Sequence, residues 1–425
     1  NDDLSYTNSL SSNFNIEGFD LNRIDDYLSL NINFYQTNQE NEDNKTIPTV
    51  LPKIKYFSGY SRKFGSVSNS SYEFYNIFRE KSNETHAKKQ QKISNKFNLT
   101  KEISEYNSKI ILETQIYNQL FNTETKFISD DNFQTGTYYR FFPIVGLSAE
   151  SPFKFKDYLK EYTFSPKVHL TVSPGYSNSN KISNEDSTNN DFSINNIYRL
   201  NRYSGSDKMD NSKRITYVIS GYSDKIKSSI SQSYEFTNNS NFHKEQGNED
   251  KLSDLLGSFE YLNKNEISYN LRYDLKNEYM KQQTINSKFE SRYGGINISY
   301  LEQTSKANDI ITKDTETLNY TFNSNKFLKF SKINLTGLYD LKKEINTEYS
   351  IGYSYFDECF GVNLDFIRKS YEEDNLKPQD ILTLTFSFKN IGSYKSTNLA
   401  VSANDKQDIE WESQTLDNKQ FYNEK

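Results

Sequence analysis

Apolar and polar residues alternate strictly between positions 265 and 275. One set of side chains is apolar or aromatic: Ile267, Tyr269, Leu271, Tyr273 and Leu275. The residues between them are polar or charged: Ser268, Asn270, Arg272 and Asp274. Successive side chains of a β-strand point to opposite faces, so this segment predicts a strand with one apolar and one polar face.

The same alternation recurs along most of the chain. It is clearest in residues 27–35, 107–117, 166–173, 214–221, 317–323, 333–341, 360–367 and 381–388. Many of these segments approach the ~9–11 residues that a tilted strand needs to cross a bilayer. With weaker candidates between them, they predict an all-β fold, a large antiparallel transmembrane β-barrel of about 20 or more strands. A soluble all-β architecture built from half-buried strands is the alternative.

The alternation also assigns a face to each side chain. In residues 27–35 we expect the apolar, even-numbered side chains to face lipid and the polar ones to face the lumen. The lumen-facing candidates are Ser29, Asn31, Asn33 and, in the segment described first, Asn270.

The connections between the predicted strands differ in length. Residues 357–358 and 293–295 are tight turns, whereas residues 37–46, 177–190 and 238–251 are long and polar. Short turns at one rim and long loops at the other are typical of outer-membrane barrels. Because the alternation fades after residue 392, we expect a barrel over residues 1–392, truncated on its N-terminal side, and a polar tail over residues 393–425.

Composition supports a barrel over a soluble or disordered chain. Only 34% of the 425 residues are hydrophobic and the mean hydropathy is −0.88, yet there are 33 Tyr and 30 Phe. The apolar fraction is low for a soluble domain, and disordered chains are poor in aromatic residues. A barrel explains both facts, since only alternate strand residues need to be apolar. No segment approaches the ~18–20 consecutive apolar residues of a transmembrane helix.

Charge and reactive residues exclude several functions. The net charge is −6 with both signs interspersed, so we expect no nucleic-acid partner. The single cysteine, Cys359, excludes an internal disulfide and a cysteine-based metal site. The three histidines, His86, His169 and His243, are widely separated, and no catalytic triad spacing or Gly-rich phosphate loop is visible. We expect no enzymatic activity, no cofactor and no metal.

Three stretches stand out from the alternation. The first is residues 49–56 (Thr-Val-Leu-Pro-Lys-Ile-Lys-Tyr), which follow a strand ending at residues 33–36. The second begins at residues 139–147 (Tyr-Arg-Phe-Phe-Pro-Ile-Val-Gly-Leu) and continues through residues 151–153, 165–166, 184–187, 192, 195–198, 202–208 and 214–217. The third comprises residues 357–363 (Asp-Glu-Cys-Phe-Gly-Val-Asn), Arg368 and residues 386–392. Their order resembles LptD, the family of lipopolysaccharide-assembly outer-membrane proteins.

The central stretch carries the most specific part of this resemblance. In the family, an acidic element precedes an Arg-x-Ser-Gly-x-Asp-Arg element. The matching residues here are Asn184, Glu185, Asp186 and Ser187, followed by Arg202, Gly205 and Asp207. Lys208 stands where the family usually has Arg, a departure that preserves the charge.

The resemblance implies a function and partners. It implies that the barrel takes lipopolysaccharide from a periplasmic bridge and inserts it into the outer leaflet. The sugars would pass through the lumen and the lipid anchor through a lateral gate between the first and last strands. It also implies a plug lipoprotein, LptE, inside the barrel, contact with outer-membrane lipid, and an N-terminal periplasmic jellyroll for which this chain has no candidate. The family's barrel is larger as well, so we expect the first strands to be missing.

Two elements of the resemblance leave alternatives open. Some family members have two adjacent cysteines near position 359, each bonded to the N-terminal domain. Here Glu358 precedes Cys359, so Cys359 either forms one such disulfide in an intact parent protein or is a free buried thiol; in this chain alone we expect a free thiol. The element at residues 184–187 either contacts sugar or a divalent cation, since carboxylates are hard oxygen ligands, or packs a loop beside Arg202 and Asp207.

Three functions other than lipid export are compatible with the pattern. A passive porin-like channel would conduct ions and give no lipid crosslink. A barrel enzyme of the outer-membrane lipase type would need Ser and His to meet on its outer face. A soluble or surface β-structural protein would stay in solution without detergent.

Overall fold

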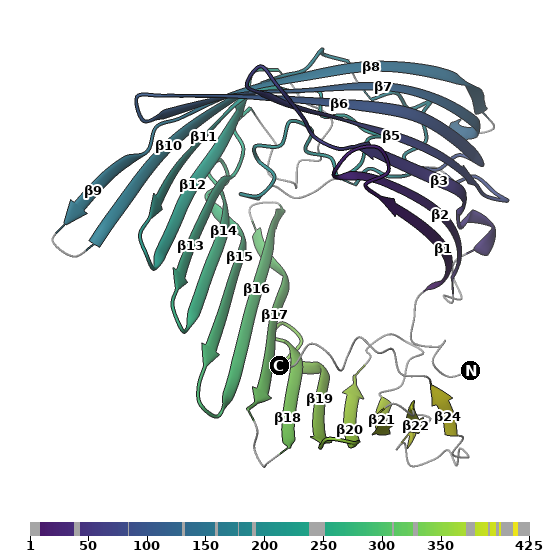
Figure 1. Cartoon of the computed structure of the whole chain (residues 1–425), viewed down its shortest axis with the longest axis vertical. Helices are drawn as coiled ribbons and strands as arrows, with labels where there is room; N and C mark the ends of the chain where they lie inside the picture. The colour runs from purple at the N-terminus through teal and green to yellow at the C-terminus, as the bar shows by residue number, and fades with distance from the viewer. Residues whose placement is uncertain are drawn as a thin grey trace. The chain divides into compact units, whose positions relative to one another are not determined.

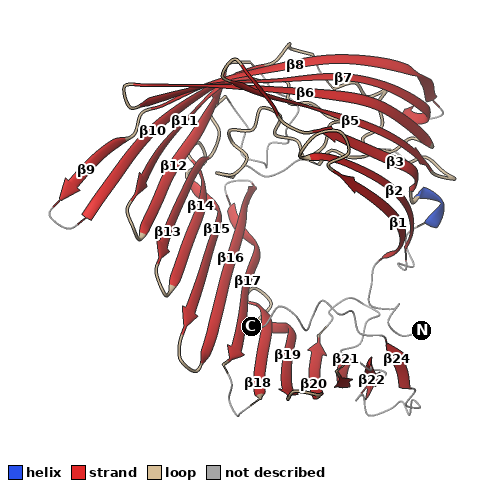
Figure 2. Ribbon diagram, in the orientation of Figure 1, coloured by secondary structure: helices blue, strands red, loops and turns tan. Residues whose placement is uncertain are grey.

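Antiparallel β-strands form nearly all the regular structure in a computed structural model of the chain (Figure 1). The structure describes residues 9–37, 43–83, 85–129, 132–157, 160–176, 178–188, 193–237, 251–307, 310–325, 330–370, 379–389, 392–396, 399–400 and 411–414. These ranges contain 24 strands and one short 3-10 helix, η2 (Asn44–Thr46), which is the blue segment in Figure 2. The prediction of an all-β, antiparallel fold with about 20 or more strands is therefore confirmed. None of the helical segments within the described ranges is long and apolar enough to cross a membrane.

The strands belong to two compact units. The first comprises residues 1–155, 163–220 and 231–254, and the second comprises residues 156–162, 221–230 and 255–425. Strands that lie wholly or partly in the first unit are β1 (Ser9–Phe19), β2 (Asp26–Thr37), β3 (Thr49–Ser58), β4 (Ser61–Lys63), β5 (Ser66–Phe78), β6 (Lys89–Glu105), β7 (Ser108–Ser129), β8 (Asn132–Glu150), β9 (Phe153–Asp157), β10 (Lys160–Val172), β11 (Lys213–Tyr222) and β12 (Ile226–Glu235).

The second unit contains the remaining strands. They are β13 (Leu255–Leu262), β14 (Glu266–Asp274), β15 (Tyr279–Glu290), β16 (Gly294–Ala307), β17 (Ile310–Ser324), β18 (Ser331–Asp340), β19 (Ile345–Phe356), β20 (Phe360–Lys369), β21 (Gln379–Phe388), β22 (Gly392–Ser396), β23 (Leu399–Ala400) and β24 (Trp411–Gln414). The last three lie in the segment expected to be a polar tail. The boundary at residue 392 stays a prediction, since most of residues 397–425 lie outside the described ranges.

Strand register in the first unit separates a polar face from an apolar face. Asn31 pairs with Lys53, and Lys53 pairs with Tyr75, so these three side chains share one face of β2, β3 and β5. The opposite face carries the pairs of Leu30 with Ile54 and of Ile54 with Phe74. The alternation of the sequence thus runs coherently across neighbouring strands.

The longer strands β6, β7 and β8 continue this division and lie side by side (Figure 1). On one face, large apolar side chains are exposed, including Ile93, Leu120 and Val145. The other face buries polar groups such as Lys92 and Gln119. An exposed apolar face is expected where a strand meets lipid instead of water.

Most connections in the first unit have the expected asymmetry; the two-residue β7–β8 connection, which lies at the rim of the longer ones, is an exception. The β1–β2 and β6–β7 connections are short and share one rim, here named the short-turn rim. The opposite rim carries the β2–β3, β5–β6 and β10–β11 connections, of which the last is by far the longest, at residues 173–212. This longest connection supplies most residues of the candidate functional site.

Candidate functional site

Residues 173–212 form a loop that folds back onto the polar face of β5–β8, and we name it the docked loop. Residues 177 and 189–192 of it, including position 192 of the sequence resemblance, lie outside the described ranges. Its two ends are held together where Ser173 N donates to Ser212 O (3.0 Å) and Ser212 N donates to Ser173 Oγ (2.6 Å). A loop with adjacent ends can carry internal packing of its own, as compact Ω-loops do.

Two distant parts of the docked loop clasp each other through reciprocal hydrogen bonds. The Asp207 carboxylate accepts from the backbone N–H groups of Glu185 (2.8 Å) and Asp186 (3.1 Å). In return, Asp186 Oδ1 accepts from the backbone N–H groups of Ser206 (2.9 Å) and Asp207 (2.8 Å). Asn184 closes the first part as a tight turn, because its side chain bonds the backbone of Ser187 in both directions.

Lys92 of β6 fixes this clasp to the strands. Its Nζ lies 2.8 Å from Asp186 Oδ2, 2.8 Å from Asp207 Oδ1 and 3.2 Å from Glu73 Oε2. The Lys92 side chain is 0% exposed, so the ammonium and carboxylates are removed from water together. A buried charge is tolerated only when it is paired, which makes this contact the electrostatic centre of the docked loop.

Other side chains of the strands complete the contact with the clasp. Tyr75 Oη donates to Asp207 Oδ1 (2.9 Å), and Gln90 Nε2 donates both to Tyr75 Oη and to Ser183 O (2.7 Å each). On the other side, Arg140 donates to the backbone carbonyls of Ser206 (2.6 Å) and Asp207 (2.7 Å). Side chains from β5, β6 and β8 therefore bind the backbone carbonyls of the loop as well as its carboxylates.

Two further ion pairs anchor the flanks of the loop. Arg79, between β5 and β6, forms a bidentate pair with Glu185 at 3.0 and 2.5 Å. Arg202, with its side chain 2% exposed, binds Asp210 (2.5 Å), which also binds Arg214 of β11 (3.0 Å). Bidentate Arg–carboxylate pairs are among the strongest and most directional hydrogen-bonded contacts.

Apolar packing and a glycine set how closely the loop approaches. Leu200 and Met209 of the loop join Tyr117, Phe142 and Ile144 of β7 and β8 in one buried cluster. A Cβ at Gly205 would lie 2.2 Å from the carbonyl oxygen of Asp186, so only glycine allows the two halves of the clasp to meet.

The electrostatics of the two clasp carboxylates differ. Burial raises the pKa of Asp207 to about 6, and the charge of Asp186 adds to this while Lys92 opposes it. Burial would also raise the pKa of Asp186, but the Lys92 ammonium and the hydrogen bonds from Asp207 N and Ser187 Oγ hold that pKa well below its usual range. The pair therefore keeps one firm anion beside Lys92 and one carboxylate that takes up a proton near neutral pH.

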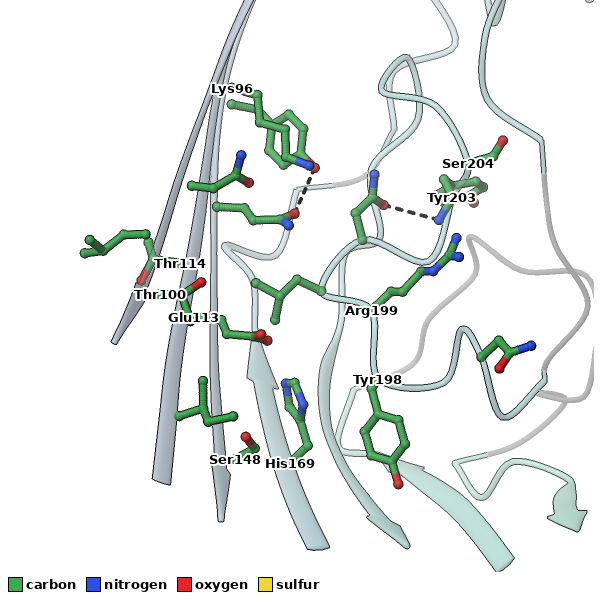
Figure 3. A pocket seen from close by; sticks show the side chains of 18 of the residues that line it. Lys96, Thr100, Glu113, Thr114, Ser148, His169, Tyr198, Arg199, Tyr203 and Ser204 are labelled. Carbon is green, nitrogen blue, oxygen red and sulfur yellow. Dashed lines mark hydrogen bonds between the residues drawn. The ribbon is translucent and has the colours of Figure 1, made fainter. Parts of the chain in front are cut away.

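A cavity of about 460 Å³ lies beside the docked loop, on the side of the short-turn rim. Figure 3 shows Thr100, Glu113, Ser148 and His169 from the strands facing Tyr198, Arg199, Tyr203 and Ser204 from the loop. The lining also includes Lys96 of β6 and Lys167 of β10. The arrangement offers cations and hydrogen-bond donors to a ligand.

The docked loop and the strands that hold it lie within a segment that matches a known protein family. A model of the family LptD, described as LPS transport system D, matches residues 2–345, which include every strand and loop residue of the site. The chain belongs to the LptD family. It is accordingly an outer-membrane β-barrel protein of lipopolysaccharide transport.

Other comparisons add less to the LptD assignment. A search of curated protein sequences gives no match. Similar solved structures include the siderophore receptor PirA from Acinetobacter baumannii (9% identity, 91% of this chain and 73% of that chain, TM-score 0.44). Another is the ferric enterobactin receptor PfeA from Pseudomonas aeruginosa, as mutant R480A in complex with enterobactin (10% identity, 91% and 72%, TM-score 0.44). The ferric citrate transporter FecA in its unliganded form is also similar (8% identity, 92% and 70%, TM-score 0.43).

The residues of the LptD motif are brought together by the docked loop. Asn184, Glu185, Asp186, Ser187, Gly205 and Asp207 make the clasp, and Arg202 lies in the neighbouring ion pair. Glu185 and Asp186 are bound by Arg79 and Lys92, so their oxygens face cations of the protein. Within the described ranges no group of three or more His, Cys, Asp or Glu residues could hold a metal ion. The geometry matches the packing alternative, and a role of these residues in sugar contact stays untested.

The lumen-facing candidates lie apart from the clasp. Ser29, Asn31 and Asn33 share the polar face with Lys53 and Tyr75 through the strand register. Asn270, in the second unit, pairs with Ser258 of β13 and Thr284 of β15, also on a polar face. Whether these faces line the lumen is still a prediction.

Cys359 lies in the three-residue turn between β19 and β20. It is exposed and has no disulfide partner in the described part of the chain. Its backbone N–H donates to Asp357 Oδ1 (2.9 Å), which fixes the turn. An exposed thiol is open to a partner domain, although a bond to such a domain remains a prediction.

Sequence reasoning did not predict that Lys92, Arg79 and Arg140 hold the loop. Lys92 and Arg79 are more than 90 residues from the loop carboxylates they bind, and Arg140 is more than 60 residues from the loop carbonyls it binds. A buried charge requires a partner, which applies to Lys92 once its burial is known. The sequence does not say which of many carboxylates that partner is.

Proposed function

We propose that the chain transports lipopolysaccharide through its lumen and inserts it into the outer leaflet of the outer membrane through a lateral gate. The match of the LptD family model over residues 2–345 carries this proposal. The polar faces of β2 and β14 supply the hydroxyl and amide groups that a sugar–phosphate cargo needs along its path. The apolar faces opposite them suit the lipid that surrounds the strands.

The partners follow from the same proposal. A plug lipoprotein similar to LptE would occupy the lumen, and a periplasmic bridge would deliver cargo through an N-terminal domain. Cys359 would form one disulfide with that domain in the intact parent protein, since the periplasm permits disulfides. A mobility shift on non-reducing gels that disappears in Cys359→Ser tests this bond.

Photo-crosslinking in cells tests transport. A photoreactive residue at Asn31 or Asn270 of the intact protein should capture lipopolysaccharide only while the energised supply is running. A probe at Leu30, on the opposite face of the same strand, serves as the matched control. It should capture resident outer-leaflet lipid whether or not the supply is running.

A passive porin-like channel is the second candidate. It is favoured if neither polar site captures lipid while the protein still fractionates as a heat-modifiable outer-membrane protein. Such a channel would show steady ion conductance in planar bilayers.

A further inference from the structure

The cavity beside the docked loop contains cations that lack the partners seen elsewhere in the site. Lys96, Lys167 and Arg199 line it, and no carboxylate in the described ranges pairs with any of the three. Glu113 is the single acidic residue of the lining. Lys92, four residues before Lys96 on the same face of β6, contacts three carboxylates instead.

Two of these cations lie against aromatic rings. Lys96 Nζ lies 5.1 Å from the centre of the Tyr117 ring, and Lys167 Nζ lies 4.9 Å from that of Tyr198. Such contacts orient an ammonium without neutralising it. The positive charge of the cavity is therefore left to attract an anion.

His169 and several hydroxyl and amide side chains complete the cavity wall. His169 is 3% exposed, and its Nε2 is buried toward Gly146, where an added Cβ would lie 2.7 Å from it, so this nitrogen gives shape to the wall and offers no contact to a ligand. Ser148, Asn201 and Ser204 add hydroxyl and amide groups around the same space.

We propose that this cavity binds phosphorylated or otherwise acidic saccharides. Lys96, Lys167 and Arg199 would hold the anionic group, and the hydroxyl and amide side chains would bond the sugar. Short turns of outer-membrane barrels face the periplasm, so a cargo from that side would reach the cavity before the docked loop. The inference rests on the proposed function and names a contact site for its cargo.

Calorimetry on the full chain in detergent tests this site. The probes are glucosamine 1-phosphate, glucosamine and inorganic phosphate, each titrated at low and high salt. The sugar phosphate should bind more tightly than the other two, with an affinity that falls as salt rises. Equal binding of inorganic phosphate or of glucosamine would overturn the proposal, because the cavity would then not recognise the combination.

Matched charge variants locate the binding. The combined variant Lys96→Gln, Lys167→Gln and Arg199→Gln should bind the sugar phosphate at least about tenfold more weakly. The control variant Lys101→Gln, Lys181→Gln and Lys213→Gln removes the same charge from exposed positions outside the cavity and should bind normally. Equal affinities in the two variants would refute the site.

A variant expected to tighten binding separates a loss of charge from a loss of folding. Glu113→Gln removes the single carboxylate and should tighten binding several-fold, a gain that damaged folding would not produce. These assays report on the cavity alone. Crosslinking at Asn31 without charge-dependent binding here would refute the cavity and leave the proposed function standing. Charge-dependent binding in the cavity without crosslinking at Asn31 would refute the proposed transport and leave the cavity as a binding site.

Discussion

Replacing Lys92 with methionine tests whether charge holds the docked loop. The change keeps a long apolar side chain but leaves Glu73, Asp186 and Asp207 without their shared cation. Removing one partner of a buried ion pair costs roughly 3–5 kcal/mol, because the remaining charge is left unpaired in a poorly solvated site. At about 1.4 kcal/mol for each factor of ten, the population of released loop should rise by a factor of roughly 10² to 4 × 10³.

Limited proteolysis measures this population. Lys181 is an exposed trypsin site within the docked loop, and cleavage follows the open population when the loop closes faster than trypsin cuts. The strands themselves should remain intact, so heat-modifiable migration should be unchanged. The reasoning would be refuted by a Lys92→Met protein that is cut at the wild-type rate.

Two further variants separate charge from packing. Lys96→Met removes a lysine from the same face of the same strand, but no carboxylate among the described residues pairs with this lysine, so the docked loop should stay closed. Adding Asp186→Asn and Asp207→Asn to Lys92→Met should restore part of the protection. The amides keep hydrogen-bond acceptors in place and remove the repulsion between unpaired charges.

Three other predictions concern the clasp and the faces of the strands. Because the pKa of Asp207 is raised to about 6, the docked loop binds a proton that a released loop, with a pKa near 3.8, does not bind; trypsin cleavage, expressed relative to that of an unfolded substrate at the same pH, should fall about tenfold from pH 7.5 to pH 5, and Asp207→Asn should abolish this relative pH dependence. Gly205→Ala should weaken docking by about 1–3 kcal/mol, since its Cβ would meet the Asp186 carbonyl, and cleavage that stays at the wild-type rate would contradict the close approach. Leu30→Arg should destabilise folding into bilayers by ~2–4 kcal/mol if the residue lies mid-membrane, whereas Asn31→Arg should be mild; equal tolerance in denaturant titrations would reject the assigned faces.

Much of the fold could be predicted because it depends on local pattern. The period-2 alternation in residues 265–275 corresponds to β14 (Glu266–Asp274), and that in residues 27–35 corresponds to β2 (Asp26–Thr37). Strand ends were less predictable: residues 107–117 account for only half of β7 (Ser108–Ser129). The second half of β7 alternates less regularly. Its inward side chains include both Gln119, which donates to Ser206 O of the docked loop, and the apolar Phe121, which pairs with Lys92.

The candidate site was predictable only in part. The motif residues Asp186 and Asp207 stood out by their resemblance to the LptD family, but their contact with each other follows from the folding of the loop. Hydrogen bonds between residues 20 or more positions apart leave no periodic trace in a sequence. The cavity was equally hidden, since Lys96 and Lys167 are unremarkable charges in the sequence until the loop brings Arg199 beside them.

The sequence by itself determined the strands, the two faces of each strand and the family. These features follow from alternation and from short motifs, in which each residue acts through its immediate neighbours. The tertiary structure decided that residues 173–212 lie against β5–β8, that Lys92 binds two motif carboxylates, and that no carboxylate in the described part of the chain pairs with the three cations of the cavity. A charged residue does not indicate in the sequence which opposite charge it will bind. Only the fold brings an ammonium from one strand to a carboxylate more than ninety residues away.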